Sequence, residues 1–275
     1  MELEHLDVVS RCLGQTLTPQ ERSNLEIGLL KRRATEQPQS IRFWGRLSGD
    51  SADYLIAVAL LPGKDFPTKK FYFCTNTSPE LQQFPEVSKK KADAAAAITS
   101  RLKGDPAFVL TPGDADPSAS QDDGGDPAAG SSLTELERLA CLVEEIDNAI
   151  AVAPLEAFVV SPLRQIIANP SFHGLDCDQA SQLYNYFHLR RPDLPERARI
   201  VLASDGLVRA GDFWDPLIQD LDGSWAVGRD NTGAYVTLRN YLYPGALSFH
   251  RPESAEHGYA YFGDGRRNPD IAFML

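Results

Sequence analysis

The sequence has 275 residues, of which 43% are hydrophobic, so the chain can bury a normal core in one large domain or two smaller ones. Lysine and arginine number 27 against 38 aspartate and glutamate residues, which gives a formal net charge of −11. This charge repels phosphate backbones, so we expect no nucleic-acid partner, and it suits either solubility or a basic protein partner.

Residues 1–110 predict a helix, a group of strands and a second helix. Thr18 and Glu21 have the spacing of a capping box, and the helix that they open must end before Pro38. "IRFWGRLSGDSADYLIAVAL" predicts two strands joined by a turn, and "FYFCTNT" predicts a third. The alanine-rich composition predicts a helix over Ser78–Lys103.

Residues 111–131, "TPGDADPSASQDDGGDPAAGS", are rich in Gly, Pro, Ser and Asp. They cannot bury enough apolar surface to offset the entropy of ordering, so we expect an acidic disordered loop. A calcium loop that starts at Asp114 would place Ala119 and Gly125 where glycine and glutamate are needed. The acidic residues of this segment are instead candidate contacts with a partner: Asp114, Asp116, Asp122, Asp123 and Asp126.

Residues 132–275 predict helices followed by strands. "SLTELERLACLVEEIDNAI" opens with the box pair Ser132 and Glu135 and carries an apolar stripe: Leu139, Val143, Ile146 and Ile150. Short extended pieces follow in "VAPLEAFVVSPLRQIIANPSF". "DCDQASQLYNYFHL" predicts a helix capped at Asp176, with its inward positions at Ala180, Leu183, Tyr184 and Phe187. "SWAV" and "AYVTLRNYL" predict a hairpin, and "ALSFH" and "YAYFG" two further strands.

This order of elements predicts an α+β fold, with grouped helices packed on a mainly antiparallel sheet and a β-rich C-terminal part. We expect residues 132–275 to form one composite domain with residues 1–110. At the end of the chain, Gly263-Asp264-Gly265 is followed by Pro269 and not by a helix, which favours a turn over a phosphate-binding loop. The last residues predict a terminal strand whose inward positions are Ile271, Phe273 and Leu275.

Patterns typical of catalysis, metals or membranes are not found in the sequence. The five histidines lack metal-ligand spacing, and there is no G-x-S-x-G motif. Asp220 and Asp222 stay open as an acid–base pair, although such pairs are mostly surface charge. The start "MELEHLDVVS" lacks the pattern of a signal peptide, and the longest apolar run is too short to span a bilayer. Four cysteines without C-x-x-C pairing indicate reduced thiols: Cys12, Cys74, Cys141 and Cys177.

The three tryptophans, Trp44, Trp214 and Trp225, are each flanked by turn residues. Aromatic side chains dominate the burial of protein cores, so we interpret these three as core residues. The alternative is that they anchor a partner, because tryptophan is enriched at the energetic centres of interfaces.

Three stretches together resemble the radial spoke head family of motile cilia. "IRFWGRLSGDSADYLIAVAL" is similar to the F-W-G-[RK]…DYY segment of that family, and "LYNYFHLRRP" to its Y-F-H segment. The stretch from "GSWAVGRD" to the closing "FML" resembles the family's carboxyl terminus. The order and distances fit from about Ile41 to Leu275, although Leu55 stands where a second tyrosine is common. The compact length and the single acidic segment resemble the short branch of the family and not the longer four/six branch.

The resemblance implies a non-catalytic structural subunit of the axonemal radial spoke head, without cofactor or metal. It implies assembly with four/six-type and MORN-repeat head subunits, and transient contact with central-pair projections whose signals regulate dynein. Two alternatives stay open: a cytosolic adaptor that captures basic partners through the acidic segment, and an enzyme whose site is not visible in the sequence. A pocket that joins His188 or His250 with a carboxylate would favour the enzyme.

Overall fold

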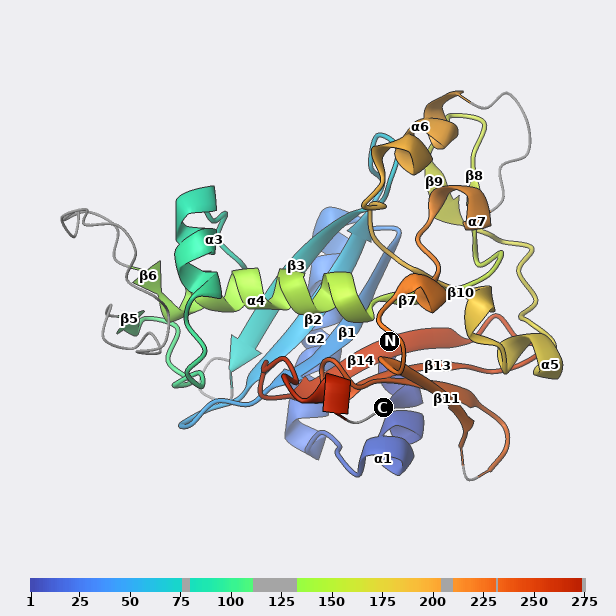
Figure 1. Ribbon diagram of the computed structural model, residues 1–275. Helices are drawn as coiled ribbons and strands as arrows, with labels where there is room; N and C mark the ends of the chain where they lie inside the picture. The colour runs from blue at the N-terminus through green and yellow to red at the C-terminus, as the bar shows by residue number, and fades with distance from the viewer. Residues whose placement is uncertain (76–79, 111–132, 204–209, 231, 274–275) are drawn as a thin grey trace.

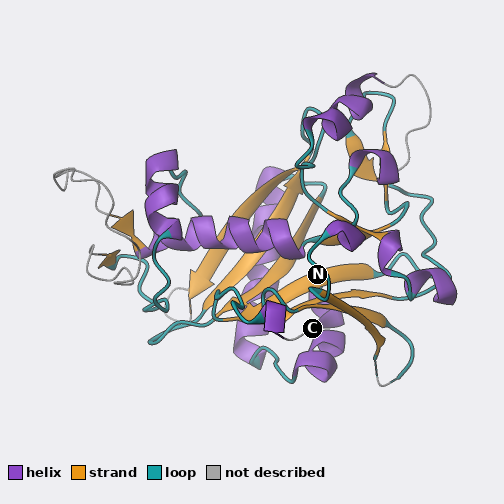
Figure 2. Cartoon of the chain, viewed as in Figure 1, coloured by secondary structure: helices purple, strands orange, loops and turns teal. Residues whose placement is uncertain are grey.

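The computed structural model describes residues 1–75, 80–110, 133–203, 210–230 and 232–273. A large sheet with helices on both faces adjoins a smaller lobe of short elements (Figures 1 and 2). The α-helices are α1 (Leu6–Leu13), α2 (Pro19–Glu36), α3 (Lys89–Ala96), α4 (Glu135–Ile150), α5 (Cys177–Ala180), α6 (Pro195–Ala203) and α7 (Ala210–Phe213). The 3-10 helices are η1 (Leu3–His5), η3 (Leu183–Asn185), η4 (Leu217–Gln219) and η5 (Ile271–Phe273).

Eight strands form the large sheet, in the order β11-β12-β13-β14-β1-β2-β3-β4. They are β1 (Ser40–Leu47), β2 (Tyr54–Leu61), β3 (Thr68–Thr75), β4 (Gln82–Gln83), β11 (Trp225–Arg229), β12 (Val236–Asn240), β13 (Ala246–His250) and β14 (His257–Gly263). The short pairs are β5 (Val109–Leu110) with β6 (Leu133–Thr134), β7 (Val152–Pro154) with β10 (Tyr186–His188), and β8 (Phe158–Val160) with β9 (Ile166–Ala168). The predicted α+β class, with a mainly antiparallel sheet and a β-rich C-terminal part, is confirmed.

The N-terminal and C-terminal strands meet at the centre of the sheet, where β1 pairs in parallel with β14. Gly45 lies opposite Tyr261 at this seam, and a Cβ atom at Gly45 would stand 2.1 Å from the Tyr261 carbonyl oxygen. Only glycine therefore allows the two backbones to approach this closely. Phe43 and Trp44 alternate into the cores on opposite faces of the sheet, and the register irregularity beside Gly45 then puts Leu47 in the same core as Trp44.

Helix α4 crosses one face of the sheet (Figure 1). Its predicted stripe is buried against that face: Leu139, Val143, Ile146 and Ile150. On the other face, α1 and α2 cover a second core that includes Leu25 and Phe43. Strand β2 lies between the two cores and is buried at seven of its eight positions, which explains why "YLIAVALL" is a continuous apolar run and does not alternate.

Helix α2 and the strands β1, β2 and β3 are as predicted, including the reciprocal capping box between Thr18 and Glu21. The helix predicted over Ser78–Lys103 is wrong, because α3 spans Lys89–Ala96 alone and β4 precedes it. Pro85 interrupts the helical sequence and cannot donate an interior backbone hydrogen bond, which separates the two elements.

Two predicted helix starts also need correction. The capping box of α4 joins Thr134 to Glu137, two residues beyond the predicted pair, because the Glu135 carboxylate is engaged elsewhere. Asp176 does cap α5, but that helix has a single turn before the chain turns through η3 into β10. Tyr184, predicted to face inward, is exposed as a result.

The end of the described chain is the 3-10 helix η5 and not a strand. Ile271 is buried as predicted, whereas the side chain of Phe273 is 87% exposed, and Leu275 lies outside the described residues. The alternation expected of a strand is lost because the backbone coils after Pro269. Gly263 is the last residue of β14, and the chain then bends at Gly265, whose backbone N–H donates to the Tyr261 hydroxyl at 2.9 Å.

Candidate functional site

The stretches that resemble the spoke head family converge on buried carboxylates. Glu135 and Asp147 lie near opposite ends of α4, and both are buried. With Leu139 and Val143 they recur every four residues, so all four occupy the stripe that faces the sheet. Because a buried charge is costly without partners, each carboxylate needs a set of donors from the strands beneath.

Asp147 joins the first and last of these stretches. The Trp44 indole N–H and the Tyr259 hydroxyl each donate to one Asp147 oxygen at 2.9 Å. The Lys69 ammonium from β3 forms an ion pair with the other oxygen. Burial and the Asp147 charge hold the pKa of Tyr259 well above its usual range, so its hydroxyl stays a donor. One carboxylate thus fixes α4 to β1, β3 and β14.

Glu135 connects the other end of α4 to the rest of the fold in the same way, by accepting several hydrogen bonds. The Tyr54 hydroxyl donates to it at 2.6 Å, and the backbone N–H groups of Lys103 and Gly104 donate at 2.7 Å. Burial, followed by the hydrogen bond and charge of Glu135, raises the pKa of Tyr54. The start of β2, at Tyr54, is thereby tied to α4 and to the loop that contains Lys103 and Gly104.

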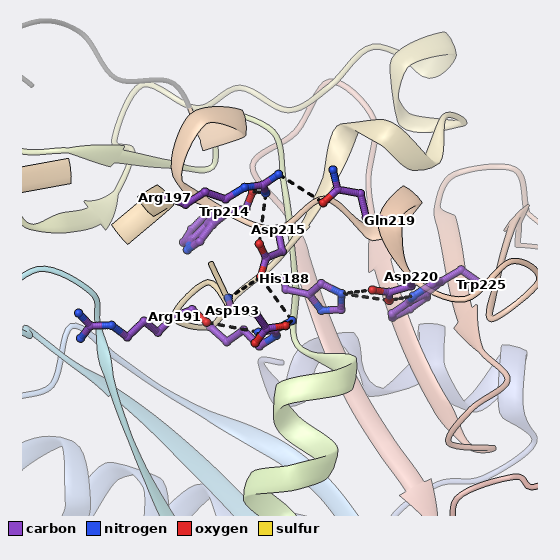
Figure 3. Close-up of polar contacts among 10 residues, drawn as sticks. His188, Arg191, Asp193, Arg197, Trp214, Asp215, Gln219, Asp220 and Trp225 are labelled. Carbon is purple, nitrogen blue, oxygen red and sulfur yellow. Dashed lines mark hydrogen bonds and ion pairs between the residues drawn. The ribbon is translucent and has the colours of Figure 1, made fainter. Parts of the chain in front are cut away.

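The Y-F-H stretch forms a third centre in the smaller lobe, at His188. The His188 Nε2 atom lies 3.0 Å from both oxygens of Asp220, and the Trp225 indole N–H donates to one of them at 2.7 Å (Figure 3). Burial alone would raise the pKa of Asp220, but these hydrogen bonds and the nearby positive charge hold it below its ordinary value.

Two arginines brace the loop that follows His188. The Asp215 carboxylate accepts from Arg197 at 3.2 Å and from the Asp193 backbone N–H at 3.0 Å (Figure 3). Arg190 binds the exposed Asp193 carboxylate through both of its terminal nitrogens and lies 3.4 Å from Asp215. The hydrogen bond and charge of Arg190 lower the pKa of Asp193. The "HLRRPD" turn is therefore held on both sides.

Arg191 is the exposed member of this turn. Its guanidinium forms an ion pair with Asp65 at 3.3 Å and lies over the Phe66 ring at 5.7 Å. Together with Arg190 it lines one end of a groove of about 660 Å³, whose other walls come from β3, the segment after β4, and α4. Lys69 and Asp147 of the buried network also line this groove.

The two histidines that would favour an enzyme both form hydrogen bonds within the fold. His188 does face a carboxylate, but only 2% of the residue is exposed, so its imidazole is shielded from solvent, whereas the Asp220 side chain is 30% exposed. His250 accepts a hydrogen bond from the Leu175 backbone N–H and contacts the Glu256 carbonyl oxygen at 3.1 Å. Burial lowers the pKa of His250 to about 4, so the imidazole is neutral at neutral pH.

Within the described part of the chain, no group of three or more His, Cys, Asp or Glu side chains is arranged to hold a metal. The four cysteines are free thiols. Across the same residues, no helix is both long enough and apolar enough to cross a membrane.

The sequence-predicted contact residues fall into two groups. Trp44, Trp214 and Trp225 are buried, at 0%, 1% and 9% exposure, which favours the core interpretation. The second group lies outside the described residues, and its role in an interface stays a prediction: Asp114, Asp116, Asp122, Asp123 and Asp126.

The sequence patterns did not predict Asp147, and they predicted Glu135 only as a capping residue, although a signal for a buried role was available. Each is a carboxylate at a position four residues from an apolar residue of the α4 stripe, and a charge on a buried stripe predicts a buried network. Asp220 was noticed together with Asp222, but nothing local pointed to His188, which is 32 residues away.

Comparisons with known proteins agree with the resemblance read from the sequence. The chain is 34% identical to "Radial spoke head protein 9 homolog" of Danio rerio, over 95% of this chain and 94% of that protein. It is 30% identical to the proteins of the same name from Homo sapiens and Bos taurus, with the same coverage. No protein-family model matches the sequence. The expected short branch is confirmed by these relatives, and the chain belongs to the radial spoke head protein 9 family.

Proposed function

We propose that this protein is a non-catalytic structural subunit of the radial spoke head in the axoneme of motile cilia or flagella. In this role it assembles with other spoke head proteins, of the four/six type and with MORN repeats. The assembled head contacts central-pair projections transiently and passes mechanical signals that regulate dynein. The observation that carries the proposal is similarity along nearly the whole chain to proteins named for the radial spoke head.

The hydrogen bonds of the three carboxylates also support a structural role. The stretches that resemble the family supply donors to each of Asp147, Glu135 and Asp220, beside others from Lys69, Lys103 and Gly104, and these carboxylates tie the sheet to α4 and the smaller lobe. The oxygens of these carboxylates accept hydrogen bonds from within the fold and are not directed toward a substrate.

Fractionation of axonemes tests the proposal. The tagged protein is expressed in a motile ciliated cell that lacks its own copy, and detergent-extracted axonemes are compared with those of a mutant without spoke heads. We expect the protein to stay with the extracted axoneme in the first cell and to be lost from it in the second. Release with the soluble matrix in both cells would contradict the proposal and favour an adaptor role.

The acidic segment has a separate test. Its five aspartates, at 114, 116, 122, 123 and 126, are replaced by asparagine. If the segment contacts the central pair electrostatically, the spoke heads assemble normally but the beat changes. Unchanged motility at normal assembly would remove the segment from the proposed function.

A further inference from the structure

Helix α2 has a second apolar stripe, on the face that points away from the sheet. Its inner face is buried at Leu25 and Gly28. On the opposite face Ile27 is 52% exposed, Leu30 is 66% exposed, and Ala34 is also exposed. These three follow the i, i+3, i+7 spacing with which one helix packs along another. Scattered apolar residues on a surface are ordinary, but this spacing makes a continuous stripe.

Two cations without ion-pair partners in the described part of the chain stand beside this stripe, whereas the exposed Glu26 on the same helix pairs with Arg22 at 3.5 Å. Lys31 and Arg33 are exposed, and neither has an ion-pair partner among the described residues. Arg32, by contrast, donates to the Leu81 carbonyl oxygen and pairs with Glu36. A chain with a net charge of −11 thus carries an apolar stripe whose two flanking charges without a partner in the described chain, Lys31 and Arg33, are positive.

A groove of about 710 Å³ runs along the same helix, between α2 and the segment Glu80–Leu81. Ile27, Lys31 and Ala34 line one side of it. Leu81 packs so closely on α2 that a Cβ atom at Gly28 would lie 2.9 Å from its Cδ1 atom. One side of the stripe is thus bordered by Leu81, which packs on α2, and not by solvent alone.

We propose that the outer face of α2 docks an amphipathic helix of another subunit, with apolar residues on one face and acidic residues beside them. The partner's apolar side chains cover Ile27, Leu30 and Ala34, and its carboxylates lie opposite Lys31 and Arg33. A second copy of this chain fits less well, because pairing two α2 stripes brings two sets of unpaired cations together. This inference rests on the proposed role as a subunit of an assembly.

Site-specific cross-linking in cells tests the docking surface. The photoreactive residue p-benzoylphenylalanine replaces Leu30 in the full chain, in a motile ciliated cell that lacks the native protein. The matched control carries it at Leu163, an exposed leucine on the turn between β8 and β9. After illumination of isolated axonemes, the cross-linked peptides are identified by mass spectrometry. The same pair is then made with Lys31→Glu and Arg33→Glu added.

We expect Leu30 to cross-link to a helical segment of another protein that is rich in Asp and Glu. The charge reversals should lower this yield about tenfold or more, while the Leu163 products stay unchanged. Retention in the axoneme with no Leu30 product above the control, with a product in a basic segment, or with a product in a second copy of this chain would overturn the inference alone. Absence of the unmodified protein from the axoneme would overturn the proposed function as well.

Discussion

Removing the Asp147 carboxylate should destabilise the protein more than removing any surface carboxylate. In Asp147→Ala the indole N–H of Trp44 and the hydroxyl of Tyr259 lose their acceptor, and Lys69 loses the charge that pairs with it. An unsatisfied buried donor costs about 1–3 kcal/mol, and a broken buried ion pair about 3–5 kcal/mol. Because the three contacts share one carboxylate they do not add, and we expect a loss of about 4 kcal/mol.

The assay is urea unfolding of the purified chain, followed by tryptophan fluorescence. Asp147→Asn keeps an oxygen for Trp44 and Tyr259 but no charge for Lys69, so its loss should be smaller. Asp193→Ala is the control, because Asp193 likewise forms an ion pair, with Arg190, but on the surface. The free energy of unfolding of this variant should fall by no more than about 1 kcal/mol. If Asp147→Ala were no more costly than Asp193→Ala, the carboxylate would not hold the layers together.

Three further predictions concern the seam, a buried histidine and the end of the chain. Gly45→Ala should lower the free energy of unfolding in urea by about 2 kcal/mol or more, since its methyl group meets a backbone oxygen. Gly228→Ala, where a Cβ atom would make only an ordinary contact at 3.9 Å with the Thr237 hydroxyl, should cost less than about 1 kcal/mol; similar losses would contradict the seam. The pKa of His250 is about 4 when folded and 6.5 ordinarily, so the unfolded chain takes up the proton first. The free energy of unfolding should therefore fall as pH drops from 6.5 to about 4, and less steeply in His250→Gln; an identical slope would refute this. In thermal melts Ile271→Ala should lower Tm, whereas Phe273→Ala should not; comparable losses in both variants would instead favour the terminal strand, in which both side chains face inward.

The sequence was most informative where local signals and burial agree. The capping box at Thr18 fixes the start of α2, and the stripe that begins at Leu139 fixes the buried face of α4. The strands β1 and β2 were visible because an apolar run ends at turn residues on each side. In each case the residues that decide the structure lie within one turn or one strand of each other.

The misses arose where the deciding contact is distant in sequence. The α4 capping box moved to Thr134 because Glu135 binds Tyr54, which lies 81 residues away. Likewise, no local pattern shows that β1 runs parallel to β14, or that Gly45 must admit a carbonyl oxygen there. The buried carboxylates could be suspected from their positions on an apolar stripe, but their donors come from strands that only the folded sheet brings near.

The most direct test of the central claim is to locate the protein within the spoke by cryo-electron tomography. Axonemes are prepared from cells in which a compact tag is inserted within residues 111–131 of this chain, and averaged spokes are compared with untagged ones. If the protein is a subunit of the spoke head, we expect added density at the spoke head, and loss of head density in cells without the protein. Added density on the stalk or elsewhere in the axoneme, with intact heads in the cells that lack the protein, would contradict it.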